Sequence, residues 1–247
     1  MSALAALVTG GGGGIGRAAC LEFARAGYRV AVCDSNAEAA EQTTTEVRKA
    51  GGEAQAYIVD IACREQVHEM IGDVRRRFGR IDAAFNNAGV SAKRVPLAEV
   101  CEDDWARVLS TNLTGTFLCM KYEILAMLEQ GGGCIVNNSS IFGVGGGINT
   151  PYTATKHGIC GLTKSAAMSY AERNVRINAV CPGLIEAGMG LQILARSPDP
   201  RAFIAGAPIN RAGSAQEVAK AVVWLCSESA SFVHGHMLAV DGGYGAR

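Results

Sequence analysis

The chain has 247 residues, of which 49% are hydrophobic and 19% charged, so it is long enough to bury a sizeable core. Lys and Arg total 23, and so do Asp and Glu, which leaves no net charge. This balance argues against nucleic acid and against an anionic membrane surface as partners. No apolar run approaches the ~20 residues of a membrane-spanning helix. Residues 1–7 lack the positively charged start of a secretory signal.

Nine cysteines are scattered along the chain, and no two form a C-x-x-C motif. An odd number inside mostly apolar segments is typical of reduced thiols that serve as small core residues. We therefore expect a cytoplasmic protein. His234 and His236 have no carboxylate or cysteine partners at ligand spacing, so we expect a turn there and no metal site.

Short apolar runs alternate with amphipathic stretches of helical length. Strands are predicted at 5–8, 29–33, 54–59, 83–86, 134–138, 176–180 and 237–240, and helices at 15–26, 38–49, 64–78, 104–128, 152–173 and 215–226. Near-continuous apolar strands are typical of a parallel sheet covered on both faces. The alternation predicts an α/β fold with a doubly wound sheet of about seven parallel strands. No linker divides the chain, so we expect a single domain over residues 1–247.

The first predicted strand leads into Thr9, five glycines at positions 10–14, and then Ile15 and Gly16 at the start of a helix. Glycines let the backbone approach a pyrophosphate, and the amino terminus of a helix presents unpaired N–H groups to it. A glycine run by itself also fits a flexible loop. The strand before it and the helix after it favour a Rossmann-type dinucleotide site.

Asp34 ends the second predicted strand, where a carboxylate can accept hydrogen bonds from an adenosine ribose diol. A 2′-phosphate would meet a like charge at this position. Residues 35–38 offer no Arg or Lys to bind such a phosphate, and Arg17 is expected on the flank of the first helix. The sequence therefore predicts NAD rather than NADP.

Tyr152 and Lys156 are spaced i and i+4, which places a phenol and an ammonium on one helix face. A nearby ammonium, together with the cationic ring of oxidised nicotinamide, is expected to lower the pKa of the phenol from ~10. The spacing alone also fits an exposed pair on an ordinary helix. Beside a dinucleotide loop, it predicts hydride exchange at an alcohol or ketone carbon, with Tyr152 moving the proton.

Taken together, these motifs resemble the classical short-chain dehydrogenase/reductase family, and the resemblance extends over essentially the whole chain. The matching segments, in the order of the family, are Thr9-Gly10-x-x-x-Gly14-Ile15-Gly16, Asp60-Ile61, Asn86-Asn87-Ala88-Gly89, Thr111-Asn112-Leu113, Ser139-Ser140-Ile141-Phe142-Gly143, Tyr152-x-x-x-Lys156, Asn178-x-Val180-x-Pro182-Gly183 and Val240-Asp241-Gly242-Gly243.

The resemblance implies a role for each matching residue. Tyr152 would exchange the proton with the substrate oxygen, and Ser140 would orient that oxygen. Lys156 would bind the nicotinamide ribose and lower the tyrosine pKa, while Asn112 would link Lys156 to solvent through a water molecule. The implied cofactor-binding residues are Gly10, Gly14, Ile15, Gly16, Asp34, Asp60, Ile61, Asn87, Ala88, Gly89, Tyr152, Lys156, Pro182, Gly183 and Ile185.

The chain departs from the family pattern in two places. Ser140 precedes Tyr152 by 12 residues, one fewer than the commonest family spacing, so counting back from the tyrosine selects Ser139 instead. We favour Ser140, because the glycine-rich loop at 144–147 can absorb a deletion more easily than a strand end can. Ala187 stands where the family often has a threonine that contacts the nicotinamide carboxamide.

Residues 187–212 are predicted to cover the substrate. This segment carries the apolar residues Met189, Leu191, Ile193, Leu194, Phe203 and Ile204. Together with Phe142, Ile148 and Asn149 they favour a hydrophobic or cyclic secondary alcohol over a sugar. The helix that carries Tyr152 has a thin side, formed by Ala154, Gly158, Gly161 and Ala166. Because the family uses this helix between subunits, we expect a homotetramer.

Two alternatives belong to other functional classes. A non-catalytic dinucleotide-binding regulator or scaffold would be expected to have lost Tyr152 or Lys156, and this chain retains both. Sugar-nucleotide epimerases and dehydratases share the Y-x-x-x-K pair. They usually carry an additional carboxy-terminal substrate domain, whereas only one helix and one strand are predicted after residue 212.

Overall fold

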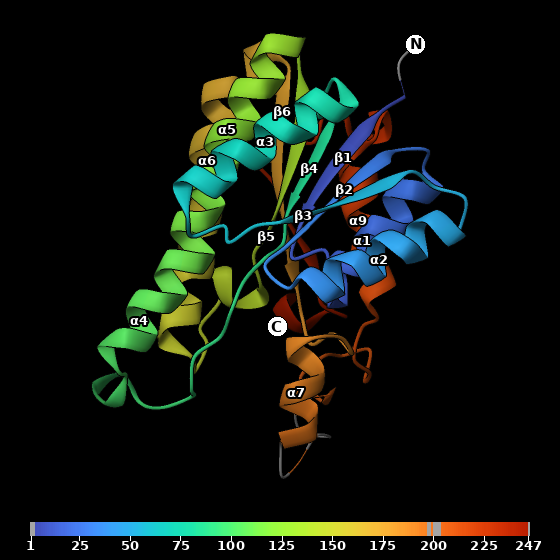
Figure 1. The fold of residues 1–247 in the computed structure, drawn as a ribbon. Helices are drawn as coiled ribbons and strands as arrows, with labels where there is room; N and C mark the ends of the chain where they lie inside the picture. Colours follow the sequence, from blue (N-terminus) through green and yellow to red (C-terminus); the bar gives the residue numbers. More distant parts are fainter. Residues whose placement is uncertain (1–2, 197–198, 200–203, 247) are drawn as a thin grey trace.

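The computed structural model describes residues 3–196, 199 and 204–246, so residues 1–2 and Phe203 of the predicted substrate segment lie outside the described residues. Within them, the strands form one parallel sheet in the order β3-β2-β1-β4-β5-β6-β7 (Figure 1). The strands are β1 Ala5–Thr9, β2 Arg29–Asp34, β3 Ala54–Ile58, β4 Ala83–Asn86, β5 Gly133–Asn138, β6 Val175–Pro182 and β7 Met237–Val240. The predicted doubly wound α/β fold is confirmed.

Helices cover both faces of the sheet (Figure 1). The helices are α1 Gly14–Arg25, α2 Ala37–Lys49, α3 Arg64–Phe78, α4 Glu102–Val108, α5 Thr116–Gln130, α6 Thr150–Tyr170, α7 Met189–Arg196 and α9 Ala215–Cys226. One apolar cluster packs α1, α2 and α9 against the sheet, and a second packs α3, α5 and α6 against the other face. The inner strands read as continuous apolar runs because both of their faces are buried.

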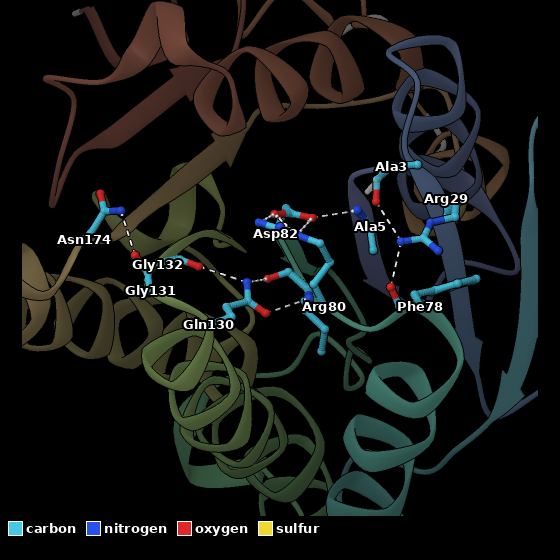
Figure 2. Close-up of polar contacts among 11 residues, drawn as sticks. Ala3, Ala5, Arg29, Phe78, Arg80, Asp82, Gln130, Gly131, Gly132 and Asn174 are labelled. Atoms are coloured by element: carbon cyan, nitrogen blue, oxygen red, sulfur yellow. Dashed lines mark hydrogen bonds and ion pairs between the residues drawn. The ribbon is translucent and has the colours of Figure 1, made fainter. Parts of the chain in front are cut away.

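Polar side chains close the edge of the sheet where its strands begin (Figure 2). The Asp82 carboxylate accepts a hydrogen bond from Ala5 N at 2.8 Å and pairs with Arg80. Gln130 accepts from Ile81 N and donates to the Ile81 and Gly132 carbonyls. These contacts satisfy backbone groups that would otherwise be left unpaired at the strand ends. The opposite edge, where the strands end, is where a cleft can open.

The predicted helix at 104–128 is wrong as a single element. A π-helix, Leu109–Gly115, separates α4 from α5. Wide turns of this kind usually occur at functional sites, and this one contains Asn112. The helix predicted at 152–173 begins earlier, at Thr150, because the Asn149 side chain caps it, and ends at Tyr170. Residues 187–212 contain a helix, α7, that the sequence did not predict.

No helix within the described residues combines the length and apolar character needed to cross a membrane. All nine cysteines carry free thiols, and seven of them are buried. The described residues also contain no group of three or more His, Cys, Asp or Glu side chains arranged to hold a metal ion.

Candidate functional site

A cleft of about 990 Å³ opens at the edge of the sheet where the strands end. In open α/β sheets this edge binds ligands, next to the point where the strand order reverses; here that point lies between β1 and β4. The predicted site residues that line the cleft are Gly10, Gly14, Ile15, Asp34, Asp60, Ile61, Asn87, Ala88, Gly89, Ser140, Tyr152, Lys156, Pro182, Gly183 and Ile185. Gly16 and Asn112 lie behind its surface.

The glycine loop has the shape of a phosphate cradle. Gly10 and Gly14 adopt positive φ angles of 62° and 53°. A Cβ atom at Gly10 would lie 2.9 Å from Ala88 Cα, and one at Gly16 would collide with the Gly10 carbonyl oxygen. The N-terminus of α1 has neither a side-chain cap nor an acidic residue in its first turn. Its N–H groups and its dipole therefore suit an anion such as a pyrophosphate.

Asp34 lies beside this loop and accepts hydrogen bonds from Gly12 N and Asn36 N, each at 2.9 Å. The Arg17 guanidinium is turned toward α2. It donates to Thr43 Oγ1 at 3.1 Å and to the Gly12 carbonyl at 2.7 Å, and it pairs with Glu46. Arg17 therefore holds the glycine loop through the Gly12 carbonyl, and the Asp34 carboxylate lines the cleft beside that loop.

A chain of hydrogen bonds joins the glycine loop to Lys156. Asn87 Nδ2 donates to the Thr9 and Gly10 carbonyls, both at 3.1 Å. Asn87 Oδ1 accepts from Asn138 Nδ2 at 2.9 Å. The Lys156 ammonium donates to the Asn138 carbonyl at 2.6 Å. The two halves of the site are therefore mechanically connected through the end of β5.

The two adjacent serines have different surroundings. Ser139 Oγ donates to the Lys156 carbonyl at 2.9 Å and lies 3.2 Å from Cys160 Sγ, so it ties β5 to the backbone of α6. Ser140 Oγ accepts from Phe142 N at 3.2 Å, and its hydrogen bond to the Tyr152 side chain lowers the pKa of that phenol. Of the two hydroxyls, that of Ser140 is paired with the tyrosine.

Tyr152 and Lys156 meet in the cleft, with the ammonium nitrogen 5.3 Å from the centre of the phenol ring. Burial raises the pKa of Tyr152 to about 12, despite the opposing Ser140 hydrogen bond. Burial also lowers the pKa of Lys156 to about 8. In the protein alone, desolvation therefore outweighs the Ser140 hydrogen bond, and the lowering expected from Lys156 together with oxidised nicotinamide stays a prediction.

Asn112 is fully buried in the π-helix. Its Oδ1 accepts from Val90 N at 2.8 Å, and its Nδ2 donates to the Val90 carbonyl at 2.9 Å and to Thr155 Oγ1 at 3.2 Å. Thr155 in turn donates to the Tyr152 carbonyl at 2.8 Å. Both N–H groups of the Asn112 amide are thus used, and its side chain reaches the tyrosine helix through Thr155.

The remaining half of the cleft is mostly apolar. Phe142, Ile148, Met189, Ile193 and Ile204 line it as expected, and Ala207 and Ile209 add to them. Leu191 and Leu194 are not among the lining residues, and Leu191 is exposed. Ala187 N donates to the Ile185 carbonyl at 2.8 Å, so neither its methyl group nor its N–H replaces a threonine hydroxyl.

Sequence reasoning missed one residue that organises the site, Asn138, and the structural role of another, Asn149. Asn138 is the junction between the glycine loop and Lys156. Asn149 caps α6 while its Nδ2 donates to Ser91 Oγ and the Ala92 carbonyl at 2.9 and 2.8 Å. The available signal was weak: a polar residue at the end of an apolar strand, and an Asn just before a helical proline.

This architecture, with a glycine loop at the reversal point of a parallel sheet, defines a dinucleotide-binding α/β protein. A family model described as enoyl-(acyl carrier protein) reductase matches residues 10–245. The chain is 42% identical over 243 residues to a 2,5-dichloro-2,5-cyclohexadiene-1,4-diol dehydrogenase of Sphingobium indicum, covering 97% of this chain and 96% of that protein. It is 40% identical over 240 residues to a cyclohexanol dehydrogenase of an Acinetobacter species, covering 97% and 94% of the two chains.

Solved structures of similar fold are also dehydrogenases or reductases. Levodione reductase superposes with a TM-score of 0.95 at 34% identity, covering 98% of each chain. An NAD+-bound xylitol dehydrogenase gives 0.92 at 37% identity, covering 97% of this chain and 98% of the other. ElxO with NADP bound gives 0.92 at 33% identity, covering 99% and 100%. The chain belongs to the classical short-chain dehydrogenase/reductase family. It is an oxidoreductase of the class that acts on alcohol and ketone carbons with a nicotinamide dinucleotide.

Proposed function

We propose that this protein interconverts a hydrophobic or cyclic secondary alcohol and its ketone, with NAD as the dinucleotide. The observation that carries the proposal is the convergence of Ser140, Tyr152 and Lys156 on one cleft that also contains the glycine loop and Asp34. A phenol, a hydroxyl and an ammonium at one point provide a proton exchanger, a hydrogen-bond donor and a positive charge.

When bound, the nicotinamide ring supplies the hydride acceptor or donor. In the oxidation, Tyr152 as phenolate takes the proton of the substrate hydroxyl while the hydride leaves the same carbon. In the reduction, the Tyr152 phenol returns that proton to the alkoxide oxygen. Ser140 donates a hydrogen bond to the substrate oxygen and holds it near the phenol. Thr155 and Asn112 keep the helix of Tyr152 against the π-helix.

The pKa of Tyr152, about 12 in the protein alone, has to fall for this exchange to run near neutral pH. The pKa of about 12 already applies with the Lys156 ammonium in place, 5.3 Å from the ring centre, where its positive charge favours the phenolate. Lys156 keeps that charge below about pH 8. We propose that the positive charge of oxidised nicotinamide lowers the pKa further.

The preference for NAD is inferred from Asp34. Its carboxylate suits a ribose diol, and a 2′-phosphate would be repelled there. Arg17, which directly follows the glycine motif, is engaged with α2 and the Gly12 carbonyl. Among the structural neighbours, the xylitol dehydrogenase contains NAD+ and ElxO contains NADP, so the proposal rests on the residues of this chain.

The substrate class is inferred from apolar residues that line the same cleft as Tyr152, namely Phe142, Ile148, Met189 and Ile193. Such a surface binds ring carbons and offers few partners for the hydroxyls of a sugar. Two relatives are named for a cyclohexadienediol and for cyclohexanol, whereas one structural neighbour is named for the polyol xylitol. Activity on polyols or sugars, with none on cyclohexanol-like compounds, would refute this part of the proposal.

The test is a screen of alcohols with NAD+ and with NADP+, in which the reduced dinucleotide is followed at 340 nm. We expect turnover of cyclic secondary alcohols with NAD+. Tyr152→Phe removes only the phenolic hydroxyl, so it should abolish turnover and leave NAD+ binding nearly unchanged. Wild-type protein that binds NAD+ and turns over no alcohol or ketone would instead support the non-catalytic regulator or scaffold.

We also propose a homotetramer, although Gly158 cannot support it. A Cβ atom at Gly158 would lie 2.8 Å from Leu113 of the same chain, so this glycine serves internal packing. Gly161 has open space beside it and Ala154 is exposed, which leaves part of the thin side of α6 available. Sedimentation should give the mass of four chains, and a monomeric mass would refute the assembly.

A further inference from the structure

Asn138, the last residue of β5, makes contacts in two directions. Its main-chain carbonyl accepts the Lys156 ammonium at 2.6 Å, and its side-chain Nδ2 donates to Asn87 Oδ1 at 2.9 Å. Asn87 holds the Thr9 and Gly10 carbonyls through its own Nδ2. One residue therefore lies between the loop that would hold the dinucleotide phosphates and the ammonium beside Tyr152.

The network determines how both amides are oriented. Thr9 and Gly10 offer carbonyl oxygens, which only accept hydrogen bonds, so Asn87 must turn its NH₂ group toward them. Asn87 then presents Oδ1 to Asn138, and Asn138 donates to this oxygen from its own NH₂ group. A side chain without a hydrogen-bond donor at position 138 cannot make this contact.

The Asn138 amide is not explained by stability alone. Its Oδ1 is buried and has no hydrogen-bond partner among the described residues. An unpaired buried acceptor costs about as much free energy as one well-made hydrogen bond contributes. The net contribution of this amide to folding is therefore small, and its evident effect is to hold the Asn87 side chain in place.

The neighbouring Asn137 provides a contrast within the same strand. Successive side chains of a strand point to opposite faces. Asn137 is fully buried on the far side, where its Nδ2 donates to Thr163 Oγ1 at 2.9 Å and its Oδ1 accepts from Asn86 at 3.1 Å. The side chains of these partners bond onward within the core, to Glu123 and to the Ile159 carbonyl.

We propose that Asn138 is a positioning residue that couples the dinucleotide loop to the proton-transferring pair, so that the two are held at a fixed separation. This inference rests on the proposed function. Asn138 acts through Asn87 on one side and through Lys156 on the other. Loss of its side chain should therefore disturb both dinucleotide binding and the environment of Tyr152.

The experiment compares Asn138→Leu with Asn137→Ser in the full-length protein, and Asn138→Asp serves as a second variant of unchanged shape. Each variant is measured by calorimetric titration with NAD+, by the pH profile of kcat/KM for cyclohexanol oxidation, and by thermal unfolding. For Asn138→Leu we expect NAD+ binding to weaken by about five- to tenfold, the effect of one lost hydrogen bond. Asn138→Asp, which also lacks the N–H, should weaken binding at least as much.

The pH profile provides the readout that a purely structural role would not change. If the ammonium moves out by about 1.5 Å, the apparent pKa of the profile should rise by about half a unit. The melting temperature of Asn138→Leu should stay close to that of the wild type. Asn137→Ser should do the reverse: it lowers the melting temperature and leaves the NAD+ affinity and the pH profile unchanged.

The outcomes separate the two proposals. Wild-type turnover with NAD+, combined with wild-type affinity and pH profile in folded Asn138→Leu and Asn138→Asp, would overturn the coupling and leave the proposed function intact. A weakened NAD+ affinity without a shift of the pH profile would also overturn the coupling. A wild-type protein that binds no nicotinamide dinucleotide would overturn both proposals.

Discussion

The assignment of Ser140 rather than Ser139 gives the sharpest prediction about the chemistry. The Ser140 hydroxyl bonds to the Tyr152 side chain and lowers its pKa, whereas the Ser139 hydroxyl bonds to the Lys156 carbonyl. A hydrogen bond to a charged group is worth about 1.5–3 kcal/mol. Ser140→Ala should therefore raise the apparent pKa of the kcat profile by about one to two units and lower kcat about ten- to a hundredfold near neutral pH.

Ser139→Ala is the matched control, since it removes the same atom one residue away. The Lys156 carbonyl lies inside α6 and keeps its helical partner, so the loss of the Ser139 bond should cost about 0.5–1.5 kcal/mol of stability, the net contribution of one hydrogen bond. For a chain of this size each kcal/mol corresponds to about 2–4 °C in melting temperature. The measurements are kcat against pH under saturating substrates, and thermal unfolding. A loss of kcat in Ser139→Ala, with normal turnover in Ser140→Ala, would refute the reasoning.

Two further predictions concern charge. Asp34→Asn removes the negative charge and keeps the side-chain shape, so the ratio of kcat/KM for NAD+ over NADP+ should fall by at least about tenfold; an unchanged ratio would show that Asp34 does not determine the choice. Burial raises the pKa of Glu123 to about 7, above the ~4.3 of an unfolded glutamate. Between these two pH values the folded state binds more protons than the unfolded state, so the free energy of unfolding falls as the pH rises from about 4.3 to about 7. Glu123→Gln should retain the contact with Asn86 and raise the stability above pH 7 by about 3 kcal/mol, with little effect at pH 4. Urea unfolding at the two pH values measures this difference, and an equal effect at both would contradict it.

Local signals predicted most of the fold. Residues 83–86 and 237–240 were predicted as strands with their observed bounds, and residues 64–78 and 215–226 as helices, because an apolar run or a helical period is visible in a short window. The prediction of one helix at 104–128 was wrong because the interruption depends on contacts that no short window contains. The π-helix depends on the buried Asn112 amide bonding to Val90 and Thr155, which are distant in sequence.

The site divides in the same way. The spacing of Tyr152 and Lys156 and the order of the glycine motif can be read along the chain, because a helix or a strand–turn–helix unit fixes those residues relative to one another. The choice between Ser139 and Ser140 could not be read with equal force. The choice depends on which hydroxyl faces Tyr152 after α6 has packed against β5. Both hydroxyls bond to α6: that of Ser139 to the Lys156 carbonyl and that of Ser140 to the Tyr152 side chain.

The sequence by itself determined the strand–helix alternation, the dinucleotide loop and the positions of the two reactive side chains, since each is written in neighbouring residues. Only the tertiary structure decided the pKa values of Tyr152 and Lys156, the position of Asn112 behind the cleft and the junction at Asn138. The physical reason is that burial and hydrogen-bond partners come from elements far apart in the chain, and the desolvation of a group depends on everything that packs around it.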